Sequence, residues 1–323
     1  MKKRIIILGA VILVVVLGAS AAWLYAASLV RTEVERLALA DGETSPQLTC
    51  GTIDISGYPF AFDIACADAV VVSGDVMARV PALRVSAMVY NPTHLLAGAT
   101  GPAEISDAFT GQRTALAWSG LEASLRLTGM RIARLSVVAD DLAWTDMLFG
   151  DTTLASSPHA ELHLLDMPEL YDGDRQLAAL ALYLRADALA VPGLAIAGTA
   201  LEVEAEMTGL PDDLTRLGAT PFLPTWQQSG GTLKLVSIQA RNDEADLTAS
   251  GELALDAAGR PNGTITIDSQ GVAERIGPMI EEPFRTLVLG VPGEDGRHAN
   301  QLNFNNGTLS SGLIPITSIP PLF

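Results

Sequence analysis

The sequence predicts a mainly β fold: curved antiparallel sheets of one-faced strands, meaning strands that are apolar on one face only, with a few short helices. An N-terminal transmembrane helix is expected to precede the sheets. Two observations predict this arrangement. A long uncharged apolar run begins at residue 5, and apolar and polar residues alternate through much of the remaining sequence. Strict alternation is typical of antiparallel strands that have one dry face and one solvated face. We expect the sheets to close as a sandwich or to curl into an open groove.

The composition suits this fold and argues against one class of partner. Of the 323 residues, 49% are hydrophobic but only 5% are aromatic, so the core must rest on aliphatic side chains. The formal net charge is −17. Because an acidic body repels the phosphates of nucleic acids, we predict no nucleic-acid partner.

Residues 1–46 are expected to hold the protein in a membrane. Residues 1–4 form a basic tip, and an uncharged run of 26 residues follows at 5–30. This run measures about 39 Å as a helix, whereas about 20 residues suffice to cross a bilayer. The positive-inside rule places residues 1–4 in the cytoplasm, which predicts a single-pass inner-membrane anchor at 5–30 and a β-rich periplasmic domain at 47–323. We expect residues 31–46 to form a helical stem that Gly42 to Pro46 ends.

A cleaved secretory signal is the alternative for the apolar run. Ala19-Ser20-Ala21 fits a small-residue cleavage site. The run continues to Val30, well beyond that site, which favours a retained anchor. Both alternatives carry residues 47–323 across the inner membrane.

The two cysteines are predicted to form a disulfide. Cys50 and Cys66 lie at equal distances in sequence from Tyr58, within a segment rich in turn-forming residues at 56–59. A hairpin centred there would place the two sulfur atoms opposite each other, and the predicted compartment is oxidising. The apolar tip, Tyr58 to Phe60, has two interpretations: it folds back onto the core, or it contacts a membrane or a partner.

Alternation identifies the apolar faces of several strands. It is clearest at 121–128, 201–208, 246–255 and 264–268. The candidates for the apolar face are Leu121, Leu125, Leu127, Leu201, Val203, Met207, Leu247, Leu253, Leu255, Ile265 and Ile267. Turn signals at 258–263 and at Asn306-Gly307 predict hairpins. Short helices are expected at 211–217 and at 272–289, where Pro278 and Pro283 would break or kink the second.

One-faced strands must cover their apolar faces with a second sheet, a helix or a ligand. Few helices are available in this sequence. Covering one leucine or valine contributes about 1.5–3 kcal/mol, so an open groove of such residues would not stay empty in water. We therefore expect a groove that is narrow, closed by a helix or filled by an apolar molecule, and lipid chains are what the periplasm offers.

The histidines do not assemble into a predicted site. The four are His94, His159, His163 and His298. His159 and His163 would lie on one strand face about 13 Å apart, too far for a shared metal. The sequence also lacks nucleophile-elbow, phosphate-loop and paired-cysteine motifs. We predict no catalytic residue, no metal and no cofactor.

The sequence resembles the bacterial domain-of-unknown-function 2125 family, which is common in alphaproteobacteria, at 55–63, at 89–95, at 250–256 with 259–263, and at 314–316 with 320–322. The residues that carry the resemblance best are Gly57, Tyr58, Pro59, Phe60, Tyr90, Asn91, Pro92 and His94. The resemblance implies an N-terminal anchor and a periplasmic β domain, and it assigns no activity. The predicted groove is also similar, at the level of fold, to AsmA-like envelope proteins, which are linked to lipid movement between membranes.

Three functions from different classes follow. The first is a non-catalytic inner-membrane protein that binds or passes lipid or other apolar chains in a β groove. The second is a structural or assembly partner in an envelope complex, with a filled core and no ligand. A third, an envelope hydrolase, would need a cleft that gathers carboxylates or histidines. An apolar groove open to solvent favours the first.

Overall fold

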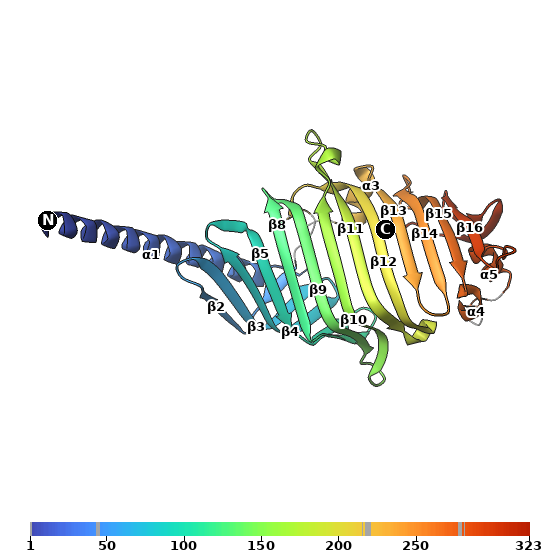
Figure 1. Ribbon diagram of the computed structural model, residues 1–323, viewed down its shortest axis with the longest axis horizontal. Coiled ribbons are helices and arrows are strands. Elements are labelled where there is room, and N and C mark those ends of the chain that lie inside the picture. The colour runs from blue at the N-terminus through green and yellow to red at the C-terminus, as the bar shows by residue number, and fades with distance from the viewer. Residues whose placement is uncertain (1, 43–45, 215, 217–220, 277–279, 281) are drawn as a thin grey trace.

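A computed structural model describes residues 2–42, 46–214, 216, 221–276, 280 and 282–323. Helix α1 (Lys2–Ala38) leads into one antiparallel sheet of 18 strands, and the remaining helices are short (Figure 1). The predicted fold class is therefore confirmed. The helices are α3 (Phe222–Gln228), α4 (Val272–Ile276), α5 (Phe284–Leu289) and the 3-10 helices η1 (Pro168–Leu170) and η2 (Pro192–Leu194).

Every pair of hydrogen-bonded strands in the sheet is antiparallel. The strands are β1 (Gln47–Thr49), β2 (Thr52–Ser56), β3 (Ala61–Ser73), β4 (Val76–Met88), β5 (Asn91–Thr100), β6 (Ala103–Asp107), β7 (Arg113–Ala117), β8 (Gly120–Thr128), β9 (Arg131–Asp146), β10 (Thr152–Asp166), β11 (Leu177–Val191), β12 (Ile196–Pro211), β13 (Thr232–Arg241), β14 (Asp246–Leu255), β15 (Pro261–Gln270), β16 (His298–Asn305), β17 (Thr308–Ser311) and β18 (Ile314–Ser318).

The sheet is a simple meander. Strands β1 and β2 both pair with β3, β5 and β6 both pair with β4, and β7 and β8 both pair with β9, so each couple is one interrupted strand. From β9 to β18 each strand pairs with the next one in the chain. Short turns suffice for such connections. At the β16–β17 turn, Asn306 and Gly307 both have positive φ, as a type I′ turn requires.

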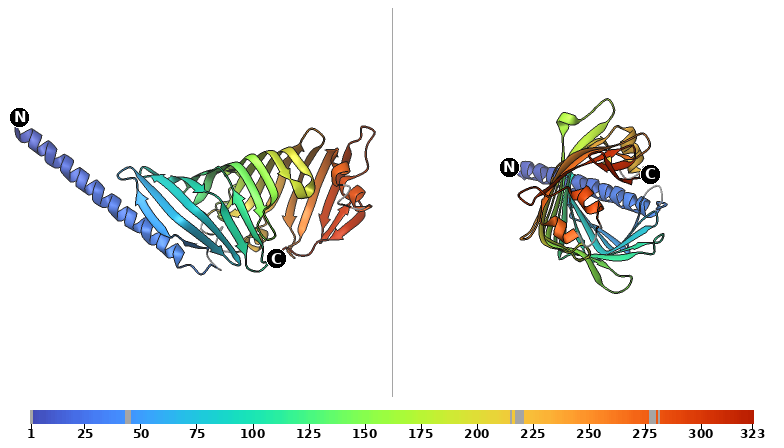
Figure 2. Two further views of the ribbon diagram at one scale, coloured as in Figure 1. Left: turned by 90° about the horizontal axis from the view of Figure 1, so that it is seen from below. Right: turned by 90° about the vertical axis from the view of Figure 1, so that its right-hand side faces the viewer.

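The sheet is curved instead of flat. Viewed along the long axis it forms a trough, with the short helices near the C-terminus inside the hollow (Figure 2). We call the face that lines this hollow the concave face. Of the two closures expected from sequence, the sheet adopts the open groove.

Helix α1 is a single helix that serves both as the apolar segment and as the stem. It is long and apolar enough to cross a membrane. Every side chain from Lys3 to Ala19 is exposed, but from Ser20 onward one stripe is partly covered. The stripe consists of Ser20, Trp23, Ala26, Ala27, Val30, Val34 and Ala38. The helix ends at Ala38, short of the predicted end near residue 46; residues 43–45 lie outside the described chain.

The bounds of two predicted helices are also corrected. Strand β12 extends to Pro211, where we expected a helix at 211–217 to begin. Leu214 and Arg216 are helical, and residues 215 and 217 lie outside the described chain. The helix expected at 272–289 is divided into α4 and α5. Pro283 immediately precedes α5. Proline is favoured at the start of a helix because the N–H that it lacks would have no partner within the helix there.

The predicted Cys50–Cys66 disulfide is present, with Cα atoms 5.4 Å apart. The expected register is wrong, because the Cα partner of Cys66 is Ile53. Cys50 lies in the break between β1 and β2. A bend of the chain at this break, and not a hairpin centred on Tyr58, therefore brings the sulfur atoms together.

Replacing Cys50 with serine is expected to lower the free energy of unfolding by roughly 2–4 kcal/mol, because the bridge restricts the unfolded chain. Urea unfolding of the full chain in detergent, followed by circular dichroism, measures this loss. Cys66→Ser and the double variant should lose the same amount, since each change breaks the same bond. A double variant that is less stable than both single variants by a comparable further amount would contradict this explanation.

Candidate functional site

One row of aliphatic side chains crosses nearly the whole sheet. Strand pairing links twelve residues in turn, each the Cα partner of the next. They are Ile55, Ile64, Val85, Ala97, Ala123, Val137, Leu162, Leu184, Val203, Ile238, Ala249 and Ile267. We call this the aliphatic row. Its eleven steps of about 4.8 Å give a length of about 53 Å.

The aliphatic row is not covered as a core would be. Each of its twelve residues is partly exposed, and none is buried. In a sandwich, a second sheet would pack about 10 Å away and remove these side chains from water. Here the single curved layer leaves them facing the hollow of the trough.

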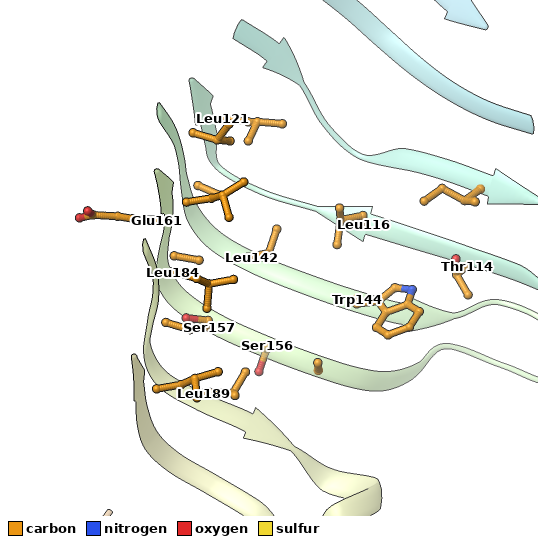
Figure 3. A pocket seen from close by; sticks show the side chains of 18 of the residues that line it. Thr114, Leu116, Leu121, Leu142, Trp144, Ser156, Ser157, Glu161, Leu184 and Leu189 are labelled. Atoms are coloured by element: carbon orange, nitrogen blue, oxygen red, sulfur yellow. The ribbon is translucent and has the colours of Figure 1, made fainter. Parts of the chain in front are cut away.

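A cavity of about 750 Å³ occupies the middle of the concave face. Val137, Leu162 and Leu184 of the aliphatic row line it. Figure 3 shows Leu142, Leu184 and Leu189 directed into the hollow, whereas Glu161 is directed away from it. The volume lies within the range of about 300–1,000 Å³ that is typical of small-molecule sites. The lining is predominantly aliphatic, so the cavity suits an apolar ligand.

Helix α3 covers part of the concave face beside the cavity. Trp226 is buried there with Ile132, Leu180 and Leu210. Its indole N–H donates a hydrogen bond to the carbonyl of Thr208 (2.8 Å). The ring rests on the backbone at Gly231, where a Cβ would lie 2.0 Å from the indole nitrogen. Glycine is therefore required at this position for the ring to pack against the chain.

The predicted apolar-face residues divide among the aliphatic row, the cavity and the α3 cluster. Val203 and Ile267 belong to the aliphatic row, and Leu121 and Leu201 line the cavity. The residues that pack against the α3 cluster are Leu125, Leu127, Met207 and Leu255. Pairing and the two-residue period place Leu247, Leu253 and Ile265 on the same face as Ala249 and Ile267.

Part of the cavity wall was not among the predicted residues. Leu184 and Leu189 come from β11, and Leu142 and Trp144 come from β9. Strand β11 is apolar on both faces over much of its length, so simple alternation does not separate its two sides. The sequence feature that could have identified this part of the wall is the leucine at every second position from Leu180 to Leu184.

Helices stand at both ends of the aliphatic row. At its start, the Trp23 ring of α1 stacks on Phe62, with ring centroids 5.5 Å apart. Phe62 is two residues from Ile64 and therefore shares its face. At the other end, the partner of Ile267 is Asn300, whose side-chain amide donates to the carbonyls of Leu287 and Val288. Helix α1 and the α5 segment thus bound the groove.

The family-motif residues lie at two neighbouring hairpin tips. Gly57 has φ +93°, and a Cβ there would lie 2.8 Å from the carbonyl oxygen of Ala61. Tyr58, Pro59 and Phe60 follow it at the β2–β3 tip, and Tyr90, Asn91 and Pro92 lie at the β4–β5 tip. His94 lies on β5, where its Nε2 is 3.0 Å from the Ser124 hydroxyl. None of these residues lines the cavity.

The histidine pair lies on the opposite, convex face. The two oxygens of the Glu161 carboxylate accept hydrogen bonds from His159 (2.8 Å) and His163 (2.9 Å), and Asp140 contacts the other ring nitrogen of His159 (2.7 Å). The bonds with Glu161 and Asp140 raise the pKa of His159. The bonds from His163 and His159 lower the pKa of Glu161. In the described part of the chain, no group of three or more His, Cys, Asp or Glu side chains is arranged to hold a metal ion.

These features define a class of protein: a membrane-length helix joined to one curved β sheet with an open apolar groove. The chain matches the family described as "Uncharacterized protein conserved in bacteria (DUF2125)" over residues 23–320, and it belongs to this family. The match begins at Trp23, so it includes the half of α1 that contacts the sheet. Searches of curated proteins and of solved structures gave no match. The similarity to AsmA-like proteins stays a prediction.

Replacing His159 with glutamine is expected to destabilise the protein more at about pH 5.5 than at about pH 8. The raised pKa of His159 means that its contribution is fully present below the ordinary value of 6.5 and is lost as the pH rises through the raised value. The lowered pKa of Glu161 means that its contribution is present above 4.5 and is lost in stronger acid. The network therefore stabilises the folded protein most between pH 4.5 and pH 6.5.

Urea midpoints of the wild-type and H159Q chains at the two pH values measure this difference. The control is a chain in which Glu161 and Asp140 are replaced with glutamine and asparagine, because the additional deficit of H159Q at the lower pH should be lost when its two carboxylate partners are absent. A deficit of H159Q that is equal or larger at the higher pH would show that the carboxylates do not stabilise a charged imidazole.

Proposed function

We propose that this protein is a non-catalytic, single-pass inner-membrane protein whose sheet lies in the periplasm, and that its concave face binds or passes lipid or other apolar chains. The observation that carries the proposal is the partly exposed aliphatic row, which runs unbroken from Ile55 beside α1 to Ile267 beside α5. Contact between water and such an apolar surface is unfavourable in free energy, and an apolar chain bound along the row would remove that contact.

The charge distribution supports the same proposal. Polar groups gather on the convex face, which carries Glu202, Glu204 and Glu206 at alternate positions of β12. The concave face carries aliphatic side chains at the intervening positions. An elongated ligand can therefore be excluded from water on one side of the sheet while the other side keeps the protein soluble.

The structural-partner alternative requires a filled core without a groove. The cavity beside α3 favours a ligand-binding role over that alternative. A hydrolytic role has less support from the same cavity. Among its charged lining residues, Glu161 is directed away, and the Asp107 carboxylate accepts hydrogen bonds from the backbone N–H groups of Phe109 and Thr110.

The proposal predicts that Leu162→Asp removes bound lipid, because it places a charge in the middle of the aliphatic row. The matched control is Leu165→Asp on the same strand, β10. Leu165 is three residues further along, so it lies on the opposite face, and it is 55% exposed. The wild-type chain and both variants are extracted from membranes in mild detergent, and co-purifying lipid is measured by native mass spectrometry.

We expect the wild-type and L165D chains to carry lipid and the L162D chain to have lost most of it. Circular dichroism and retention of the disulfide verify that each variant is folded. Equal lipid content in all three proteins, or a wild-type chain with none, would contradict the groove proposal.

A further inference from the structure

The surroundings of α1 change abruptly at Ser20. On its N-terminal side, from Lys3 to Ala19, no side chain is covered by the rest of the protein. From Ser20 to Ala38 the covered stripe of the helix faces the domain. The apolar run at 5–30 therefore contains two parts in different environments, although its composition is uniform.

The β2–β3 hairpin tip marks the point of this change. The Tyr58 hydroxyl lies 2.6 Å from the Ser20 hydroxyl. The Trp23 indole N–H donates a hydrogen bond to the Ala61 carbonyl (3.0 Å), and its ring meets the Tyr58 ring edge-on with centroids 5.6 Å apart. These contacts fix the tip at the height of residues 20–23 of the helix.

Helix length places the same point at a membrane surface. Residues 5–23 extend about 28 Å, close to the hydrocarbon thickness of about 30 Å. Strand β2 runs back from the β2–β3 tip beside α1 (Figure 1), so a hydrocarbon layer that reached Val30 would include the exposed Asp54 and Ser56. Exposed polar side chains and sheet edges are not tolerated there. The hydrocarbon boundary therefore lies near Trp23, a residue type that favours this interface.

A second hairpin tip lies at the same edge of the sheet. The backbone N–H of Val89, at the β4–β5 tip, donates to the Phe60 carbonyl at the β2–β3 tip (2.9 Å). Phe60 is 71% exposed and Tyr90 is 79% exposed. Aromatic side chains without a protein partner at the level of a membrane surface suit the headgroup layer, where an apolar ring with a polar end is favoured.

We propose that the tips Tyr58–Phe60 and Met88–Tyr90 insert into the interfacial layer of the bilayer that α1 crosses. The β2–β3 end of the concave face then meets the membrane surface, and the lipids of that leaflet are the source of the chains that enter the groove. This inference rests on the anchoring part of the proposed function. Insertion of the tips does not itself require that lipid occupy the groove.

The opposite edge of the sheet supplies a matched control. Phe109, at the β6–β7 tip, is 86% exposed. The backbone N–H of its neighbour Ala108 donates a hydrogen bond to the carbonyl of Asp75. The adjacent residue, Gly74, donates its backbone N–H to the carbonyl of Gly42, just past the end of α1. Residues 20 and 38 of the helix are about 27 Å apart along its axis, so Phe109 lies far from the proposed membrane surface.

The test labels one introduced cysteine at a time with an environment-sensitive fluorophore. Cys50 and Cys66 are bonded to each other, so the introduced thiol is the one that reacts. Phe60→Cys, Tyr90→Cys and Phe109→Cys chains are reconstituted into vesicles of phosphatidylethanolamine and phosphatidylglycerol, with or without lipids that carry a spin-label quencher close to the headgroup.

We expect a blue-shifted emission and loss of fluorescence with quencher lipids for the labels at residues 60 and 90, and neither change for the label at 109. Flotation of the vesicles verifies that each variant is anchored. Labels at 60 and 90 that behave like the label at 109, in chains that float, would overturn the inference. Lipid bound in the groove is measured separately on the same preparations, so failure of tip insertion and failure of the groove proposal give different results.

Discussion

The structure depends on one constraint, which is that a single β layer must shield its apolar face from water. Alternation places the aliphatic side chains of nearly every strand on the concave side, and in the part of the chain that the structure describes no second sheet covers them. Curling reduces their contact with water but does not remove it. Short pieces of helix supply the rest of the cover, and each acts at one place along the groove.

Each covering helix is held by specific polar contacts as well as by packing. Trp226 combines burial among leucines with a hydrogen bond to Thr208, and the adjacent Gln227 amide donates to the Asp256 carbonyl (2.9 Å). At the far end, Asn300 bonds to the last turn of α5. Because such contacts fix each helix over one region, the centre of the aliphatic row stays uncovered and the cavity persists there.

Much of the fold was predictable, because alternation and turn residues are local signals. The hairpins at 258–263 and at Asn306-Gly307 illustrate this, as does the pairing of the two cysteines. The register at Cys66 was not predictable, since it depends on a bend between β1 and β2. Apolarity on both faces of β11 hid the cavity wall at Leu184. The covered stripe of α1 was hidden as well, because residues 24–30 are as apolar as a membrane span although they lie beside the sheet.

The meander also determines the direction and the length of the groove. Each of the twelve strands that the aliphatic row crosses contributes one residue to it, so the row runs across the strands and its length depends on their number. A further hairpin would extend it by about 10 Å, whereas longer strands would only widen the trough. The row begins beside the anchor helix because α1 precedes β1 in the chain. Consecutive strands then carry the apolar surface steadily away from α1, which is the geometry that the proposed passage of an apolar chain out of a membrane requires.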